Sequence, residues 1–148
     1  MKVAIGADHA GFHEKEAVKA TLDEMGIEYV DMGTDSAESV DYPDFALKVG
    51  EAVAKGYVQQ GILFCGSGTG MAIAANKIRG IRAAVAWSED IARLAQQHNN
   101  ANILALPARF ISQDEVNKLI KAWFAADFEG GRHERRIEKI TAIENAHL

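Results

Sequence analysis

The chain has 148 residues with a formal net charge of −5, of which 48% are hydrophobic, 25% are charged and one is cysteine. This length and composition are typical of one soluble globular domain with a sizeable core. The acidic balance argues against nucleic acid as a partner, because there is no basic surplus to bind phosphate backbones. A single cysteine excludes an intrachain disulfide. The N-terminus turns polar too early for a signal peptide, and no apolar run is long enough to span a membrane, so we expect a cytoplasmic protein with no membrane partner.

Short apolar strands alternate with helices along the whole chain. The pattern predicts five strands, at 3–5, 27–32, 62–64, 81–87 and 103–106. It predicts helices between and after them, at 12–25, 42–55, 88–97, 112–124 and about 132–145, with a further helix begun by 72–75. Ser88 and Ser112 are expected N-caps, and Gly26 is expected to end the first helix. We expect a five-stranded parallel sheet covered on both faces by helices, with ligands bound beyond the carboxyl ends of the strands. No repeat, low-complexity segment or linker divides the sequence, which predicts one domain over 1–148.

The most informative stretch is 61–76, GILFCGSGTGMAIAAN, which is typical of a buried strand, a glycine turn and the start of a helix. Gly66, Gly68 and Gly70 allow the backbone to bend and to approach a ligand closely. Such a turn directs several backbone N–H groups at one point. We therefore expect it to hold a phosphate, or an oxygen that becomes negative during a reaction.

Cys65, the only cysteine, stands at the end of this strand. A thiol beside a helix N-terminus has a lowered pKa, so Cys65 could serve as a base or nucleophile next to the N–H groups that stabilise an anion. The alternative is a small buried cysteine beside an ordinary strand-to-helix turn. The loop alone supports both interpretations.

Three familiar glycine loops do not match. A nucleotide triphosphatase loop requires a lysine that is absent here, and a dinucleotide fingerprint requires glycine where Met71 or Ile73 stands. A cysteine phosphatase would need arginine six residues after Cys65, and that residue is again Met71. The positive charge for an anion must come from elsewhere in the chain.

Polar residues also follow other strands. Asp8 and His9 come directly after the first strand, where they could form an acid/base pair, or simply a capping aspartate and a solvated histidine. His98 and Asn99 end a helix, a position that favours histidine through the helix dipole alone. The five histidines are scattered and there is no second cysteine, so the spacing indicates no metal site.

A basic cluster follows the Gly-Gly pair at 130–131. Arg132 and Arg136 lie one helical turn apart on one face, and with His133 they could clamp a phosphate. The alternative is a solvated charged face, which is the expected role of Arg135. The same helix carries an apolar stripe, which predicts that it docks on its own domain or on a partner chain.

Together these segments resemble ribose-5-phosphate isomerase B, a family that includes galactose-6-phosphate and allose-6-phosphate isomerases. The resemblance covers essentially the full length and is carried by six segments in register, 8–12 (DHAGF), 41–43 (DYP), 65–70 (CGSGTG), 74–77 (AANK), 97–99 (QHN) and 129–133 (EGGRH). It implies a Rossmann-like three-layer α/β/α sandwich and an aldose–ketose isomerase that acts on a sugar phosphate without metal or organic cofactor. It also implies a homodimer or tetramer whose active sites take residues from both chains, with the C-terminal helix at the dimer interface.

The resemblance further implies residue roles. Cys65 would move a proton between C1 and C2 of the sugar through a cis-enediolate, with the Ser67 hydroxyl nearby, and His98 of the partner chain would assist ring opening. The substrate-binding residues implied are Gly66, Gly68, Thr69 and Gly70 for the enediolate oxygen, Asp8, His9, Tyr42 and Asn99 for the sugar hydroxyls, and Arg109, Arg132, His133 and Arg136 for the phosphate.

One departure bears on the base. Some members carry glutamate directly after the last loop glycine and use it as the base, whereas this chain has Met71, which leaves Cys65 as the candidate. Two other functions remain open at this point. One is an isomerase of another sugar phosphate, such as allose 6-phosphate, galactose 6-phosphate or a tetrulose phosphate, and the other is a non-catalytic phosphate- or nucleotide-binding module.

Overall fold

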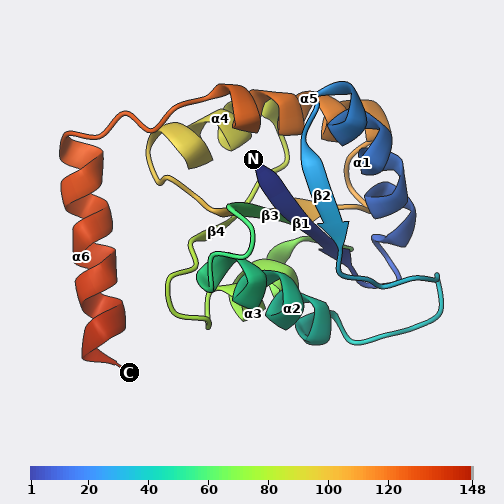
Figure 1. The fold of residues 1–148 in the computed structure, drawn as a ribbon, viewed down its shortest axis with the longest axis horizontal. Helices are drawn as coiled ribbons and strands as arrows, with labels where there is room; N and C mark the ends of the chain where they lie inside the picture. Colours follow the sequence, from blue (N-terminus) through green and yellow to red (C-terminus); the bar gives the residue numbers. More distant parts are fainter. Residues whose placement is uncertain (148) are drawn as a thin grey trace.

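The computed structural model describes residues 1–147 and contains one five-stranded parallel sheet in the order β2-β1-β3-β5-β4 (Figure 1). The strands are β1 (Lys2–Ala7), β2 (Glu28–Asp31), β3 (Gln60–Cys65), β4 (Ala83–Val85) and β5 (Ile103–Pro107). The helices are α1 (Phe12–Glu24), α2 (Tyr42–Ala54), α3 (Thr69–Ala75), α4 (Glu89–Gln97), α5 (Gln113–Ala125) and α6 (Arg132–Ala146). The predicted α/β/α sandwich is confirmed. None of the helices in residues 1–147 has the length and hydropathy needed to cross a membrane.

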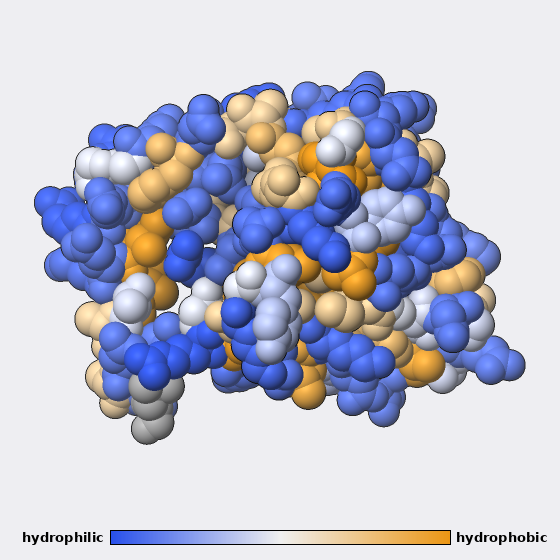
Figure 2. All heavy atoms as spheres, in the orientation of Figure 1, coloured by the Kyte–Doolittle hydropathy of each residue, from blue (hydrophilic) through white to orange (hydrophobic). Residues whose placement is uncertain are grey.

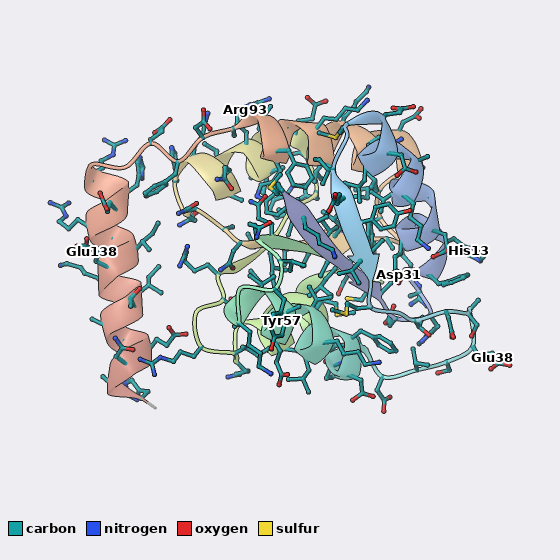
Figure 3. The ribbon with its side chains drawn as sticks, in the orientation of Figure 1. His13, Asp31, Glu38, Tyr57, Arg93 and Glu138 are labelled. Carbon is teal, nitrogen blue, oxygen red and sulfur yellow. The ribbon has the colours of Figure 1, made fainter. Side chains whose placement is uncertain are left out.

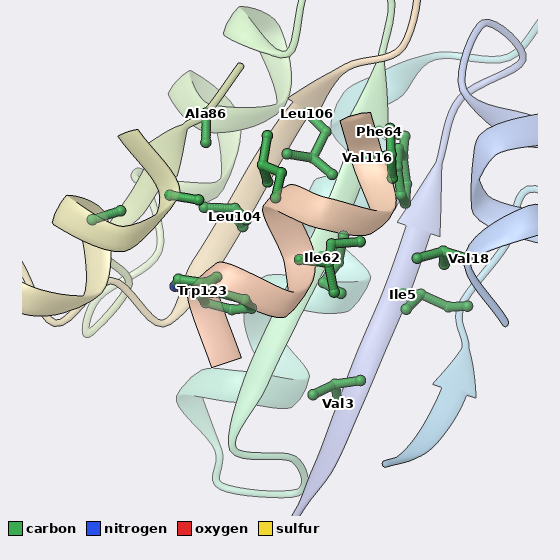
Figure 4. Packing of buried hydrophobic residues seen from close by; sticks show 14 of the residues in the cluster. Val3, Ile5, Val18, Ile62, Phe64, Ala86, Leu104, Leu106, Val116 and Trp123 are labelled. Atoms are coloured by element: carbon green, nitrogen blue, oxygen red, sulfur yellow. The ribbon is translucent and has the colours of Figure 1, made fainter. Parts of the chain in front are cut away.

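Two apolar clusters bury the two faces of the sheet. Helices α1, α4 and α5 cover one face, where Ile62 and Phe64 of β3 pack with Leu104 of β5 and Trp123 of α5 (Figure 4). Helices α2 and α3 cover the other face, and there Cys65 belongs to the second cluster. Alternate residues of β3 therefore serve opposite cores, as expected for a central strand buried on both faces.

Local signals set most of the boundaries. The Ser88 hydroxyl accepts a hydrogen bond from Ile91 N–H, and the Ser112 hydroxyl accepts one from Glu115 N–H, so both predicted N-caps are confirmed. Gly26 follows α1 with φ +68°, a left-handed conformation that ends the helix.

The predicted strand at 81–87 is shorter in the structure, where β4 covers only Ala83–Val85. Side chains replace the strand ladder at its start, because Arg82 N–H donates to Asn102 Oδ1 at 2.8 Å and the Asn76 amide bonds both N and O of Ala83. Helix α3 begins at Thr69, inside the glycine loop, whereas the alanine run predicted a start at 72.

Helix α6 stands away from the sandwich, at the far left of Figure 1. Near its C-terminal end, Asn145 Oδ1 accepts from Arg79 at 3.0 Å and Glu144 Oε1 accepts from Gly80 N–H at 3.0 Å. Ile140 and Ile143 of its apolar stripe remain 48% and 64% exposed. Figure 2 shows hydrophobic side chains along the inner side of this helix, facing a hollow beside the sandwich. The stripe is therefore not covered by its own chain.

An ion network ties α1 to the end of β2. Lys15 is fully buried, and its Nζ lies 2.7 Å from Asp31 Oδ2 and 2.7 Å from Glu16 Oε2, while Lys19 lies 2.8 Å from Asp31 (Figure 3). Partial burial raises the pKa of Asp31, but the hydrogen bonds from Lys15, Lys19 and Gly33 N–H outweigh it and lower this pKa to about 2. Asp31 is thus the counter-ion of a lysine that has no access to water.

We expect Asp31→Asn to reduce the free energy of unfolding by roughly 1–2 kcal/mol at pH 7, because the buried Lys15 ammonium then keeps only the Glu16 carboxylate as its partner. The lowered pKa sets the direction of the pH effect. The stabilisation is fully present above pH 3.8, the ordinary pKa of the carboxyl, and is lost as the pH falls through about 2. Urea unfolding at pH 7 and at several acidic pH values checks this, and a constant difference between the two proteins down to pH 2 would contradict it.

Candidate active site

The carboxyl ends of β1, β3 and β5 bring one group of the predicted residues together. Cys65 ends β3 and is 4% exposed. Its carbonyl accepts a hydrogen bond from Ala108 N–H at 2.9 Å, and the Gly66 carbonyl accepts one from Arg109 N–H at 3.1 Å. These bonds fix the segment after β5 against the glycine loop, so the Arg109 backbone is held beside Gly66.

The glycine loop is shaped by its neighbours. Gly68 has φ +77°, and a Cβ there would lie 3.1 Å from backbone carbon of Leu106, so only glycine fits without strain. A Cβ on Gly70 would lie 2.7 Å from the Tyr42 ring, and one on Gly66 would lie 3.3 Å from the Arg109 side chain. The Tyr42 phenol and the Arg109 guanidinium therefore border the loop.

Polar groups of the loop line its open side. Ser67 and Thr69 are exposed, and the Ser67 hydroxyl accepts a hydrogen bond from Thr69 N–H at 3.3 Å. Met71, which stands where some relatives were expected to have glutamate, is fully buried in the same apolar cluster as Cys65. A carboxylate at that position would have to enter this cluster, which agrees with a site that uses a different base.

Asp8 and His9 complete this side. Asp8 is 6% exposed, and its Oδ1 accepts from the N–H groups of Ala10 and Gly11 at 2.9 and 3.2 Å. His9 Nδ1 lies 3.1 Å from the backbone nitrogen of Val40, which ties the loop between β2 and α2 to the end of β1. We call this group the Cys65 half-site; its residues are Asp8, His9, Tyr42, Cys65, Gly66, Ser67, Gly68, Thr69, Gly70 and Arg109.

The remaining predicted residues gather elsewhere, in what we call the His98 half-site; they are His98, Asn99, Arg132, His133 and Arg136. His98 follows α4, and its ring stacks on His133 of α6 with centroids 4.1 Å apart and planes 8° apart. Glu129 lies beside both rings, with its Oε1 3.6 Å from His98 Nε2 and 3.4 Å from His133 Nε2. Asn99 is exposed next to them, as are both arginines.

The two half-sites lie near opposite ends of the central strand β3. The residues just before His98 border the start of β3, since Gln96 Oε1 is 3.5 Å from Gln60 Nε2. Cys65 lies five residues further along that strand, which at about 3.3 Å per residue is roughly 16 Å away. Arg109, expected with the other phosphate ligands, lies with Cys65 and not with Arg132. Within one chain, Cys65 and His98 cannot act on the same small molecule.

The electrostatics of the His98 half-site suit an anion. Burial lowers the pKa of His133, and the positive charges of His98, Arg132 and Arg136 lower it further, while Glu129 acts in the opposite direction. His133 is 7% exposed, so its burial and its charged neighbours both favour the neutral imidazole. Arg132 and Arg136 carry the charge that a phosphate would bind.

A metal ion is another ligand to consider at this half-site. Nitrogen and oxygen atoms that could coordinate one lie within 4.8 Å of one another on His98, Glu129 and His133. Their ring geometry does not fit one. A metal at about 2 Å must lie in the plane of each coordinating ring, but planes that are nearly parallel and stacked at 4.1 Å direct their lone pairs along parallel lines. Without rotation of one ring, the cluster is suited to hydrogen bonds and charge rather than to coordination.

Two features of the site were not anticipated from the sequence. Glu129 entered the sequence analysis only within the segment 129–133 of the family resemblance; it lies before α6, and its Oε1 comes within 3.4 Å of His133 Nε2. The stacking of His98 on His133 joins residues 35 positions apart and has no local signal. Both belong to the His98 half-site.

Comparisons with known proteins identify the family of the chain. A family model described as Ribose/Galactose Isomerase matches residues 3–140. The chain belongs to this family.

A ribose-5-phosphate isomerase B of Escherichia coli is 48% identical to it over 97% of the chain and 96% of that protein. The isomerase B structure from Clostridium thermocellum superimposes with a TM-score of 0.98 at 47% identity, covering all of both chains. The structure of the Mycoplasma genitalium isomerase, which has bound ribulose 5-phosphate, superimposes with a TM-score of 0.93 at 42% identity over 97% of this chain and 96% of that one. Both half-sites lie inside the matched family region.

Proposed function

We propose that this member of the ribose/galactose isomerase family interconverts ribose 5-phosphate and ribulose 5-phosphate, with Cys65 as the base. The observation that carries the proposal is the Cys65 half-site, in which a single buried thiol adjoins a glycine loop and two polar strand ends. Its supports are the isomerase B names of full-length relatives and the ribulose 5-phosphate bound to one of them.

The chemistry is the transfer of a proton between adjacent carbons. The Cys65 thiolate takes the proton from C2 of the open-chain aldose, and the C2–H electron pair forms the C1=C2 bond while the carbonyl oxygen becomes negative. Loop N–H groups from Gly66 to Gly70, with the Ser67 hydroxyl, stabilise that oxygen. Transfer of the C2 hydroxyl proton to O1, and return of the thiol proton to C1, give the ketose. No step requires a metal or a redox cofactor.

The active unit we infer is a homodimer, in which each Cys65 half-site faces the His98 half-site of the other chain. The separation of the halves within one chain supports it, because His98 and Arg132 otherwise have no route to the substrate. The uncovered stripe of α6 supports it as well. A groove of 760 Å³ separates this helix from the sandwich and is lined in part by Ile81, Ile140 and Ile143. A second copy of the chain would bury these side chains.

In that dimer both chains contact the sugar phosphate. His98 assists opening of the furanose ring, and Asp8, His9, Tyr42 and Asn99 contact hydroxyl groups. Arg132, Arg136 and His133 bind the phosphate from one chain and Arg109 from the other. Gripping the phosphate supplies binding energy that orients C1 and C2 at the thiol.

We expect Arg132→Ala to raise KM for ribose 5-phosphate about 10- to 100-fold, since one charge-assisted contact of about 1.5–3 kcal/mol is lost. Arg135→Ala is the matched control, because Arg135 is exposed on the same helix and is not assigned to the phosphate site. Steady-state kinetics of the two variants checks the expectation. An unchanged KM in Arg132→Ala would remove this arginine from the phosphate site.

The substrate is tested by assaying the purified protein with ribose 5-phosphate, with allose 6-phosphate, galactose 6-phosphate and a tetrulose phosphate in parallel. Fast turnover of ribose 5-phosphate is the expected result. Turnover of only another sugar phosphate would keep the mechanism and change the substrate. Binding of sugar phosphates without any turnover would overturn the proposal in favour of a non-catalytic binding module.

A further inference from the structure

Glu129 is an acidic residue with no role in the mechanism above, yet it faces the two histidines of the His98 half-site. The negative charge of this carboxylate repels the phosphate that the neighbouring arginines would bind. Phosphate binding therefore does not explain why Glu129 lies there. Its Oε1 lies between His98 Nε2 and His133 Nε2, at 3.6 and 3.4 Å. The geometry directs its charge at the imidazoles.

The backbone holds Glu129 in this place. Its N–H donates to the carbonyl of Gln97 at 3.0 Å, which joins the connection between α5 and α6 to the end of α4. Gly130 and Gly131 follow with φ +69° and +57°, conformations that turn the chain sharply into α6. His133, the second residue of α6, then stacks on the His98 ring. The carboxylate and the stacked ring thus contact His98 from two sides.

We propose that Glu129 is a positioning residue, whose carboxylate and stacked His133 neighbour hold the His98 ring for opening of the sugar ring. This rests on the proposed function. In ring opening His98 accepts the proton of the anomeric hydroxyl, the bond from C1 to the ring oxygen breaks as C1=O1 forms, and the imidazolium returns the proton to the former ring oxygen. The Glu129 carboxylate, 3.6 Å from His98 Nε2, stabilises by its negative charge the imidazolium that forms.

The chemistry of the two substrates provides a specific test. Ribose 5-phosphate closes to a furanose, because its O4 can attack C1. Ribulose 5-phosphate cannot form the corresponding five-membered ring, because the required O5 carries the phosphate. A defect in ring opening therefore slows the reaction that starts from ribose 5-phosphate and spares the one that starts from ribulose 5-phosphate.

The experiment compares initial rates in both directions for wild type, Glu129→Gln and Glu134→Gln. General acid–base catalysis contributes 10²- to 10⁴-fold, and we expect loss of the positioning carboxylate to lower kcat with ribose 5-phosphate by about 10-fold. We expect kcat with ribulose 5-phosphate to change less than about 2-fold. Glu134 is exposed on the first turn of α6 and is the matched control, for which both rates should stay unchanged.

The decisive quantity is the ratio of the two kcat values, with ribose 5-phosphate and with ribulose 5-phosphate, measured on one preparation. Partial unfolding, or weakened assembly of the dimer, would lower both rates equally and leave the ratio unchanged, and an unchanged ratio would overturn the proposal. In a His98→Ala background, Glu129→Gln should cause no further change in the ratio, because it acts through His98. If wild type turns over neither substrate, the proposed function itself fails, and this outcome differs from all of those above.

Discussion

Cys65→Ala is expected to lower kcat for isomerisation by roughly 10³-fold or more, because it removes the only candidate base at C2. The polar alternatives in the Cys65 half-site are committed to other contacts. Asp8 Oδ1 accepts two backbone N–H groups, and His9 Nδ1 faces Val40. Met71, at the position where another base could stand, is buried and has no titratable group. No neighbour is placed to replace the thiolate.

The measurement should separate chemistry from binding. Binding of ribulose 5-phosphate to Cys65→Ala, followed by calorimetry, is expected to remain within a few-fold of wild type, because the phosphate and hydroxyl contacts are intact. Incorporation of solvent deuterium at C1 should disappear together with turnover. Cys65→Ser is a useful companion, since a hydroxyl keeps the volume of the thiol but is far less acidic. Turnover close to wild type in Cys65→Ala would exclude the thiol as the base.

The sequence was sufficient for features that depend on neighbours along the chain. Ser88 and Ser112 cap helices as predicted, because a cap is a bond to a residue three positions away. The glycine loop could likewise be predicted from its own residues, because left-handed backbone and close approach are properties of glycine itself. The alternation of strands and helices was enough for the parallel sheet.

What could not be predicted depends on contacts between distant segments. The pattern of α1 did not identify Lys15 as a buried residue, because its counter-ion Asp31 stands on another element. The start of β4 was placed too early, because the side chains of Asn76 and Asn102 replace ladder bonds there. The separation of Cys65 from His98 follows only once the strand order and the path of α4 are known.

That separation leads to the second large effect, which concerns mixtures of two variants that are each nearly inactive toward ribose 5-phosphate. Cys65→Ala leaves its own His98 half-site intact, and His98→Ala leaves its own Cys65 half-site intact. In a mixed dimer, one of the two active sites combines both mutations and the other combines both intact halves. Two variants that are each nearly inactive should therefore regain activity when their chains are allowed to exchange.

The expected size of this effect follows from symmetry. Random reassociation of equal amounts makes half of the dimers mixed, and each mixed dimer carries one intact site of two, which gives about a quarter of wild-type activity with ribose 5-phosphate.

The chains are mixed under mild denaturation, returned to native buffer and assayed, and each variant treated alone is the control. Mixing Cys65→Ala with the double variant C65A/H98A provides a second control, since no pairing of those chains restores a thiol. Activity in the first mixture would require that each active site draws on two chains. Its absence, with mixed dimers demonstrated by mass, would mean that Cys65 and His98 do not meet across a dimer interface.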